Sequence, residues 1–299
     1  MSNMKSVYGS KKENYIFKQR VKSIILFIWF LILAVICVLP LIMLLLNSSR
    51  EKTDIALNGF SFIPGDHLFK NLKTLFKDPD YNSVFMPLYG FRNSAFQAVC
   101  ATVLAIFFSC LTAYGIQIYD FKIKEAAYMA ILIVMMVPMQ VTSAGFVTFM
   151  RRINLDDSYV PLIIPALASP AIVYFMRSYM KSSFPADIVE AARIDGCSEL
   201  RTFVQIAMPM MKPAVAVQSI FAFIAQWNNF YTPNLILLTV PTKSKTLPMM
   251  ISGLGASDIL TDLGVNYTAI AISIIPIVIV YLILSKFIIG GVALGGVKE

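Results

Sequence analysis

Acidic and basic side chains are interspersed in one stretch of the chain, residues 177–213, which we call the polar segment. Side chains of these types form ion pairs and hydrogen bonds, and a surface rich in them fixes the orientation of a bound partner. Acid–base catalysis would need convergent groups in a cleft, and the single histidine, His67, lies far away in sequence. The polar segment is therefore predicted to dock a partner. Its charged residues are Asp187, Glu190, Asp195, Glu199, Arg177, Lys181, Arg193, Arg201 and Lys212.

Neutral amides form a second group, and they fall in apolar surroundings. An amide can hydrogen-bond a hydroxyl group, and the neighbouring rings of Phe230 and Tyr231 can stack on the C–H faces of a sugar. These groups predict a path for a neutral, hydroxyl-rich solute. The same amides can instead join helices to one another, and the sequence leaves both interpretations open. The candidate path residues are Gln226, Trp227, Asn228, Asn229, Asn93 and Gln140.

Metal and disulfide chemistry find no support in the sequence. Cys37, Cys100 and Cys110 lie in apolar runs, where a thiol behaves as a small hydrophobic group. Together with Cys197 they have neither the spacing of metal ligands nor that of a disulfide framework. We therefore expect no metal site and no cofactor bound by this chain.

The elements that must position these groups are membrane helices. Of the 299 residues 58% are hydrophobic and only 14% are charged, against about 45–50% and roughly 25% in soluble domains. About 20 apolar residues in a helix cross a bilayer. The sequence predicts an all-α, polytopic membrane protein that contacts lipid, with spans at residues 23–49, 93–119, 126–150, 158–176, 214–238 and 265–284.

None of these six spans contains Asp, Glu, Lys, Arg or His. Ionisable groups inside a membrane mark proton relays, ion-coupled carriers and voltage sensors, so their absence argues against all three. It also argues against an intramembrane glycosyl or lipid transferase, which would need convergent carboxylates, histidine or metal. A transported solute is thus expected to be uncharged. The energy must come from another polypeptide, since the chain lacks the ATP-binding pattern G-x4-G-K-[ST].

The distribution of lysine and arginine between the connecting segments predicts which side of the membrane each segment faces. With the N-terminus inside, 15 of the 25 basic residues lie on the inner side and 10 on the outer side, which favours cytoplasmic termini. This placement explains the net charge of +8 without nucleic acid. The apolar run after the N-terminal tail is too long for a signal peptide. We expect a tail at 1–22, a membrane domain at 23–284 with an outer loop at 50–92, and a C-terminal tail at 285–299 that is too glycine-rich for a stable helix.

The polar segment itself is predicted to form a helix, a glycine turn and a second helix. Pro185 suits a helix start, and Gly196 suits the left-handed position that ends a helix. Ser198 can begin the second helix, and Pro209 with Pro213 is expected to end it before the next span. A helix-turn-helix can read DNA. Here four acids offset the basic charge and two membrane spans tether the element, so a solvated loop or a docking element for a cytoplasmic partner fits better.

The polar segment resembles the EAA motif, EAA-x3-G-x9-I-x-x-P, of the membrane subunits of bacterial ABC importers. Three residues separate Ala192 from Gly196, and nine separate Gly196 from Ile206. The sequence Ala-Arg-Ile-Asp-Gly at 192–196 resembles the motif of the members that take up carbohydrates. The sequence Gly-Gly-Val-Lys at 295–298 resembles the C-terminal end of the MalG type of subunit. Cys197 and Met208 depart from the usual Ala and Leu with little change in volume. The motif residues are Glu190, Ala191, Ala192, Arg193, Asp195, Gly196 and Pro209.

The resemblance implies a permease subunit, not an enzyme, in the membrane of a bacterium. Such a subunit pairs with a second, homologous permease, with two ATPase subunits below and an extracytoplasmic solute-binding protein above. ATP and Mg²⁺ then belong to the ATPase, and the EAA residues form the helices that couple ATPase closure to alternating access. The solute implied is a sugar, in particular an oligosaccharide. The remaining alternative is another ABC importer branch with a non-sugar solute, although an anionic solute would call for a basic group in the path.

Overall fold

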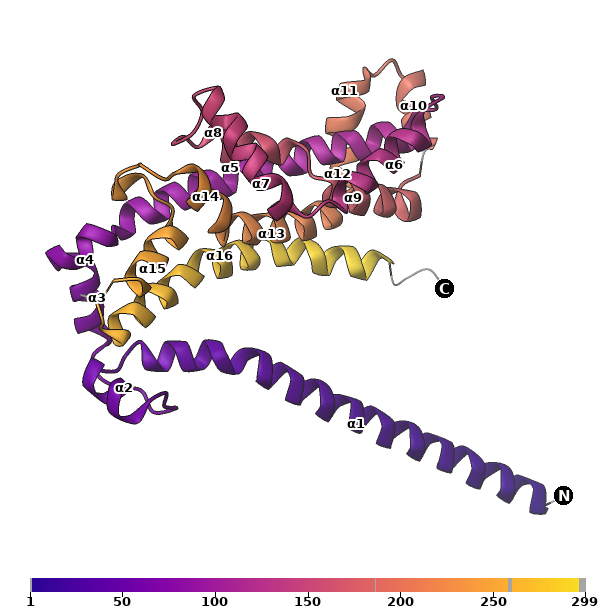
Figure 1. Ribbon diagram of the computed structural model, residues 1–299. Coiled ribbons are helices and arrows are strands. Elements are labelled where there is room, and N and C mark those ends of the chain that lie inside the picture. The colour runs from indigo at the N-terminus through magenta and orange to yellow at the C-terminus, as the bar shows by residue number, and fades with distance from the viewer. Residues whose placement is uncertain (1, 186, 258–259, 296–299) are drawn as a thin grey trace. The chain divides into compact units, whose positions relative to one another are not determined.

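The computed structural model describes residues 2–185, 187–257 and 260–295, and this part of the chain contains helices and no strand (Figure 1). The N-terminal half forms α1 (Ser2–Asn47), α2 (Lys52–Asn58), α3 (Leu68–Lys77), α4 (Pro79–Val84), α5 (Pro87–Ile118), α6 (Lys124–Met135) and α7 (Met139–Arg152). There follow α8 (Val160–Ile163), η1 (Ile164–Leu167), α9 (Pro170–Ser183), α10 (Asp187–Ile194), α11 (Glu199–Thr202), the π-helical turn η2 (Phe203–Ala207) and α12 (Met208–Met210). The last elements are α13 (Lys212–Trp227), α14 (Tyr231–Ile236), η3 (Thr242–Ser244), α15 (Leu247–Gly255) and α16 (Leu263–Gly295).

Four helices of the described chain are long and apolar enough to cross a membrane: Lys18–Asn47, Pro79–Ile118, Val160–Ser183 and Leu263–Phe287. Two bent pairs bring the number to six if each pair is one span. The six predicted spans match these elements in order. The predicted outer loop contains α2, α3 and α4, so it carries secondary structure of its own.

The two bent spans break where the sequence places helix-disturbing residues. The helices Lys124–Met135 and Met139–Arg152 meet at 93°, with Pro138 between them. Proline lacks the N–H that would continue the helix, which accounts for the break at this position. The second pair, Glu199–Met210 and Lys212–Ile236, is bent by 82°. Within it the helix α13 ends at Trp227, so Asn228 and Asn229 lie in non-helical backbone before α14.

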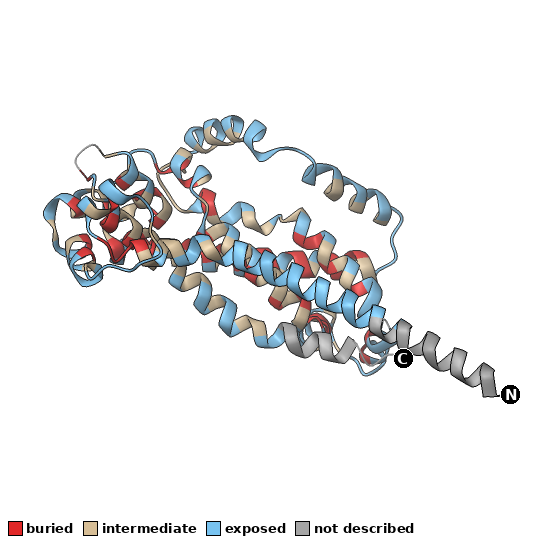
Figure 2. Ribbon diagram, turned by 90° about the horizontal axis from the view of Figure 1, so that it is seen from below, coloured by how far each residue is buried: buried red, intermediate tan, exposed pale blue. Residues whose placement is uncertain are grey.

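Contacts divide the chain into two compact units. Unit 1 comprises Met1–Leu72 and Asp262–Ala271. Its centre is the turn after α1, where residues 47–50 are all buried. The start of α16 approaches this turn so closely that a Cβ at Gly264 would lie 2.3 Å from the Arg50 carbonyl oxygen. Along most of its described length α1 is exposed, as Figure 2 shows in pale blue.

Unit 2 comprises Lys73–Thr261 and Ile272–Glu299, and α5 is its central helix. The helices α9 and α13 pack most extensively along α5, and α8, η1 and α15 contact it as well. Small residues such as Ala101, Ala105 and Ala113 on α5 are buried and allow this close approach. The helix α5 is thus the centre around which the other helices of unit 2 pack.

One local prediction is confirmed and another is wrong. The second helix of the polar segment ends at Met210 and α13 begins at Lys212, so the break lies between Pro209 and Pro213 as predicted, with Pro209 in the first turn of the short helix α12. A proline is tolerated at the first turn of a helix, where its missing N–H has no partner to lose. The glycine-rich tail is helical as far as Gly295, because it extends α16, whose nucleus already exists. Residues 296–299 lie outside the described residues.

Candidate functional site

The polar segment has an inner face that is part of the core of unit 2. Val189 of α10 and Phe203, Ala207 and Met211 after it are buried in one cluster with residues of α5 and α9. The ring of Phe203 lies 5.3 Å from that of Tyr114 on α5. Burial of this apolar surface fixes the polar segment on the ends of two membrane helices, so a movement of one must displace the other.

A polar clasp adds to this attachment. The Arg193 Nε donates to Glu199 Oε1 at 2.7 Å, which joins α10 to α11 across the glycine turn. The hydroxyl of Tyr119, the residue that caps α5, donates to Glu199 Oε2 at 2.5 Å. The Arg193 guanidinium also lies 5.3 Å from the centre of the Tyr119 ring. We call Tyr119, Arg193 and Glu199 the clasp.

The clasp changes the electrostatics of its carboxylate. The hydrogen bond from Arg193, and after it the one from Tyr119, lowers the pKa of Glu199 below its ordinary value. The same ion pair raises the pKa of Arg193 further. At neutral pH both groups are therefore fully charged, and the clasp is closed.

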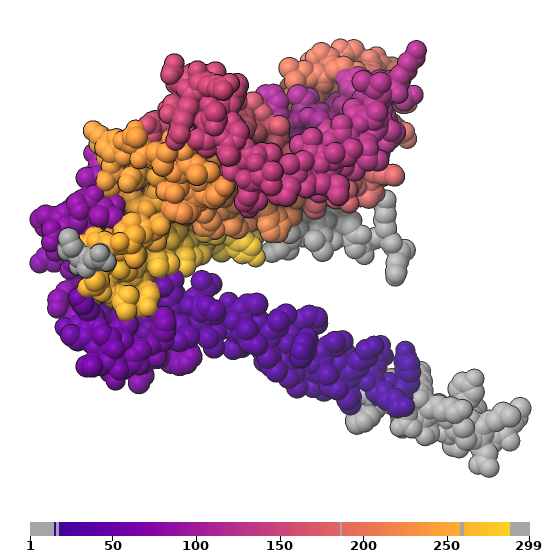
Figure 3. Space-filling model, viewed as in Figure 1, coloured from indigo at the N-terminus to yellow at the C-terminus, as the bar shows by residue number. Residues whose placement is uncertain are grey.

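The outer face of α10 is exposed and partly apolar. Ile194 lies four positions after Glu190 and three after Ala191, which places it beside both of them on the helix surface. All three are exposed, and the Ile194 side chain is 87% accessible. Figure 3 shows residues 187–202, in the salmon part of the colour range, at the molecular surface. The outer face of α10 thus presents an aliphatic side chain beside a carboxylate, and both are accessible to a partner.

The predicted docking residues divide between these two faces. Ala192 is buried within the chain, so its small side chain serves packing here rather than contact with a partner. Arg193 is held in the clasp. Asp195 and Pro209 are exposed, and Gly196 has φ +76° with no atom within 4 Å of a Cβ placed on it. Gly196 therefore adopts the predicted left-handed turn, and its surface is open.

A cavity of about 570 Å³ lies between α5, α7, α9 and α13 and is lined also by α8, η1 and α14. This volume is within the range of about 300–1,000 Å³ typical of small-molecule sites. Most of the lining is apolar, and none of the described residues that line it is charged. Its polar side chains are amides and hydroxyls: Gln218, Gln226, Asn229, Thr142, Ser143, Ser169 and Thr232.

Only some of the predicted path residues line this cavity. Gln226 and Asn229 do, whereas Gln140 and Asn228 are exposed outside its lining. Trp227 is buried, stacks on Phe223 and donates its Nε1–H to the carbonyl of Ser273 at 3.0 Å.

Asn93 also lies outside the cavity lining, and its side chain is hydrogen-bonded to backbone. Its Nδ2 donates to the carbonyl oxygens of Lys243 and Lys245, both at 2.9 Å. The predicted path residues therefore have different environments, although the same role was predicted for all of them from the sequence.

Two residues that line the cavity, Gln218 and Ser143, were not among the path residues predicted from the sequence. Gln218 precedes Gln226 by eight positions, so the helical period places both amides on one side of α13. Ser143 lies 2.9 Å from the hydroxyl of Tyr231 and belongs to the row that follows Pro138. The period of span five was the signal for Gln218. No pattern pairs Ser143 with Tyr231, because 88 residues separate them.

Comparison with known families and proteins gives a consistent result. The family described as "Binding-protein-dependent transport system inner membrane component" matches residues 101–293. The chain is 33% identical over 284 residues to the arabinooligosaccharides transport system permease protein AraQ of Bacillus subtilis, covering 93% of this chain and 96% of that protein. It is 26% identical over 281 residues to the lactose transport system permease protein LacG of Rhizobium radiobacter, covering 94% and 98%.

The fold is also similar to a solved one. A chain of a bacterial ABC transporter involved in the import of the acidic polysaccharide alginate superposes with a TM-score of 0.72. The match covers 89% of this chain and 96% of that chain, at 23% sequence identity. At this identity the likeness shows the fold.

Proposed function

Because the chain belongs to the family of binding-protein-dependent transport system inner membrane components, we propose that it is a MalG-type permease subunit that helps to import an oligosaccharide. Membership makes it a multi-pass membrane protein and a transporter component rather than an enzyme. Importers of this class combine a permease with an ATPase and a solute-binding protein. The proposal concerns the solute, the partners and the residues that serve them.

The observation that carries the proposal is the neutral polar lining of the cavity in unit 2. Amides and hydroxyls at its wall can exchange hydrogen bonds with sugar hydroxyls, and the apolar remainder can contact C–H faces. A charged solute would lose its hydration in this cavity without gaining an opposite charge from the lining, which is costly. The relatives named for arabinooligosaccharide and lactose transport support the same solute class.

The polar segment supplies the second part of the proposal. Its outer face, with Glu190, Ala191 and Ile194, seats in a cleft of an ATPase subunit. Its inner face and the clasp transmit the displacement to α5 and α9, both of which line the cavity. ATP and Mg²⁺ are bound by the ATPase and not by this chain.

The remaining assembly follows the same scheme. A second, homologous permease completes the translocation path, two ATPase subunits bind on the cytoplasmic side, and a solute-binding protein delivers the sugar outside. Both termini are then cytoplasmic in a bacterial cell membrane, in agreement with the excess of basic residues at the inner segments.

Uptake by the reconstituted importer tests the solute path through a matched pair of amides. Asn229→Leu removes a cavity amide and is expected to lower uptake of a labelled oligosaccharide or to change the preferred solute. Asn228→Leu alters the adjacent amide, which is exposed outside the cavity lining, and serves as the control. Equal uptake by both variants, with a loss of thermal stability alone for Asn229→Leu, would assign these amides to helix packing.

A further inference from the structure

The end of α1 holds a distant loop through one asparagine. The Ser61 N–H donates to Asn47 Oδ1 at 3.1 Å, and Asn47 Nδ2 donates to the Ser61 carbonyl at 3.1 Å. Both backbone groups of Ser61 are thus bound to a single buried side chain at the last residue of α1. These two hydrogen bonds hold the backbone of Ser61 level with the C-terminal end of α1.

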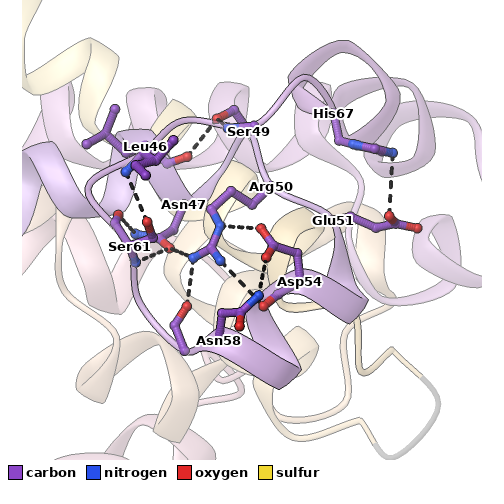
Figure 4. Close-up of polar contacts among 12 residues, drawn as sticks. Leu46, Asn47, Ser49, Arg50, Glu51, Asp54, Asn58, Ser61 and His67 are labelled. Atoms are coloured by element: carbon purple, nitrogen blue, oxygen red, sulfur yellow. Dashed lines mark hydrogen bonds and ion pairs between the residues drawn. The ribbon is translucent and has the colours of Figure 1, made fainter.

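Arg50 fixes Asn47 in turn. Its guanidinium donates to Asn47 Oδ1 at 2.8 Å, to the Gly59 carbonyl at 2.7 Å and to Asp54 Oδ2 at 2.6 Å (Figure 4). The Arg50 side chain is only 3% accessible, and a buried guanidinium is retained only when its donors are satisfied. The bond to Gly59 attaches the loop at a second point, two residues before Ser61.

Ser49 attaches the far side of the same loop. Its hydroxyl accepts from the Gly65 N–H at 2.9 Å, and its carbonyl accepts from the His67 N–H at 2.8 Å. Residues 59–67 are therefore bound before, at and after Ser61 to residues 47–50. The loop cannot rise far above the end of α1 while these bonds persist.

The side chains that this loop presents are apolar and open. Phe60 and Phe62, the two neighbours of Ser61, are 61% and 62% accessible, and Ile63 is 74% accessible. We call Phe60, Phe62 and Ile63 the apolar tip. The Phe60 ring also lies 5.6 Å from the ring of Tyr267, whose hydroxyl makes it amphipathic.

The depth of the apolar tip follows from α1. Lys18–Asn47 is an apolar span, of which the most apolar window buries no residue within this chain. The sequence changes from Leu44, Leu45 and Leu46 to the polar residues 47–50, which marks the boundary between hydrocarbon and head groups. A tip tied to Asn47 must lie at this boundary, where apolar side chains such as Phe can be buried between head groups and acyl chains.

From this geometry we propose that residues 59–63 are an interfacial anchor whose apolar tip inserts into the head-group region of the outer leaflet. The occupant is phospholipid, because the tip continues the lipid-facing surface of α1 and lies at its end. The anchor holds the first span at a fixed depth. This inference requires a membrane-spanning α1 with the proposed cytoplasmic N-terminus, but not the proposed solute or the coupling role of the polar segment.

Fluorescence quenching in the complete importer tests the anchor. A fluorescent amino acid is incorporated at position 62, and the complex is placed in nanodiscs of phosphatidylethanolamine and phosphatidylglycerol. Nitroxide lipids labelled near the top of the acyl chain are expected to quench it more strongly than lipids labelled at the chain end. The same probe at position 66, where the Asp66 side chain is 93% accessible, should respond to a water-soluble nickel chelate instead.

Two outcomes would overturn the proposal. Quenching at position 62 by the aqueous chelate, with protection on addition of the solute-binding protein, would assign the tip to protein docking. A probe at position 62 that neither the nitroxide lipids nor the nickel chelate quench would assign the tip to a contact with another membrane subunit. The variant Asn47→Asp, which removes the donor to the Ser61 carbonyl, should reduce lipid quenching at position 62, and unchanged quenching would contradict the role of the attachment.

Discussion

At the scale of single residues, Gly196 combines a backbone requirement with an open surface. Its φ of +76° is costly for most side chains, by about 1–2 kcal/mol, whereas Asn and Asp tolerate this region better. No atom of the chain would meet a Cβ there. A side chain at 196 would therefore disturb a partner more than the fold.

We predict that Gly196→Asp abolishes solute uptake while the protein still inserts into the membrane. Gly196→Ala and Gly196→Asn separate the causes, because Ala is small but strained and Asn is larger but tolerates the backbone. A clash with the ATPase requires Asn to impair uptake more than Ala. Normal uptake and normal co-purification of the ATPase with Gly196→Asp would refute this role.

Glu199 is the second residue whose role can be isolated. We predict that Glu199→Gln lowers uptake by about two- to fivefold at neutral pH, the range that corresponds to an exposed ion pair, since it weakens the clasp to Arg193 and Tyr119. A double-mutant cycle with Tyr119→Phe measures the coupling between the two residues. The matched control is Arg201→Gln, which removes the Arg201–Gln205 bond on the same segment without touching α5.

The pH dependence of the clasp has a defined sign. The folded state lowers the pKa of Glu199, so the stabilisation is complete above the ordinary glutamate value and is lost as pH falls through the lowered one. Unfolding midpoints of the wild type and of Glu199→Gln should therefore differ near neutral pH and converge in the acidic range below about 4.3. A difference that grows as pH falls would contradict the assignment.

At the scale of elements, Asn93 joins the start of the long helix α5 to the turn that contains η3. Asn93→Leu would leave the carbonyls of Lys243 and Lys245 without their donor, at a cost of about 1–3 kcal/mol. We predict a lower unfolding midpoint with an unchanged order of solute preference. A changed order of solute preference with an unchanged unfolding midpoint would indicate instead that Asn93 contacts the solute.

The sequence predicted elements best where local chemistry decides them. Charge-free runs located the six spans, and Gly196 located the turn of the polar segment. Propensity failed in the glycine-rich end of α16, which is helical as far as Gly295. There the preceding helix overrides the preference of single residues.

At the scale of the whole molecule, the contacts that sequence could not supply are those between distant residues. Tyr119 and Glu199 are 80 positions apart, and Asn93 and Lys243 are 150 apart, so no periodicity pairs them. Such contacts decided which amides line the cavity and which are structural. The docking residues were predicted as a motif, but the division into an inner face with Ala192 and an outer face with Ile194 required the fold.

The central claim is that an ATPase binds the outer face of α10. The most direct test places a photo-crosslinking amino acid at position 194 in the assembled importer, with position 57 as control, because Ile194 and Leu57 are 87% and 84% accessible. The account predicts a covalent adduct with the ATPase subunit from position 194 and none from position 57. An assembled, transporting complex that yields no ATPase adduct from position 194 would contradict it.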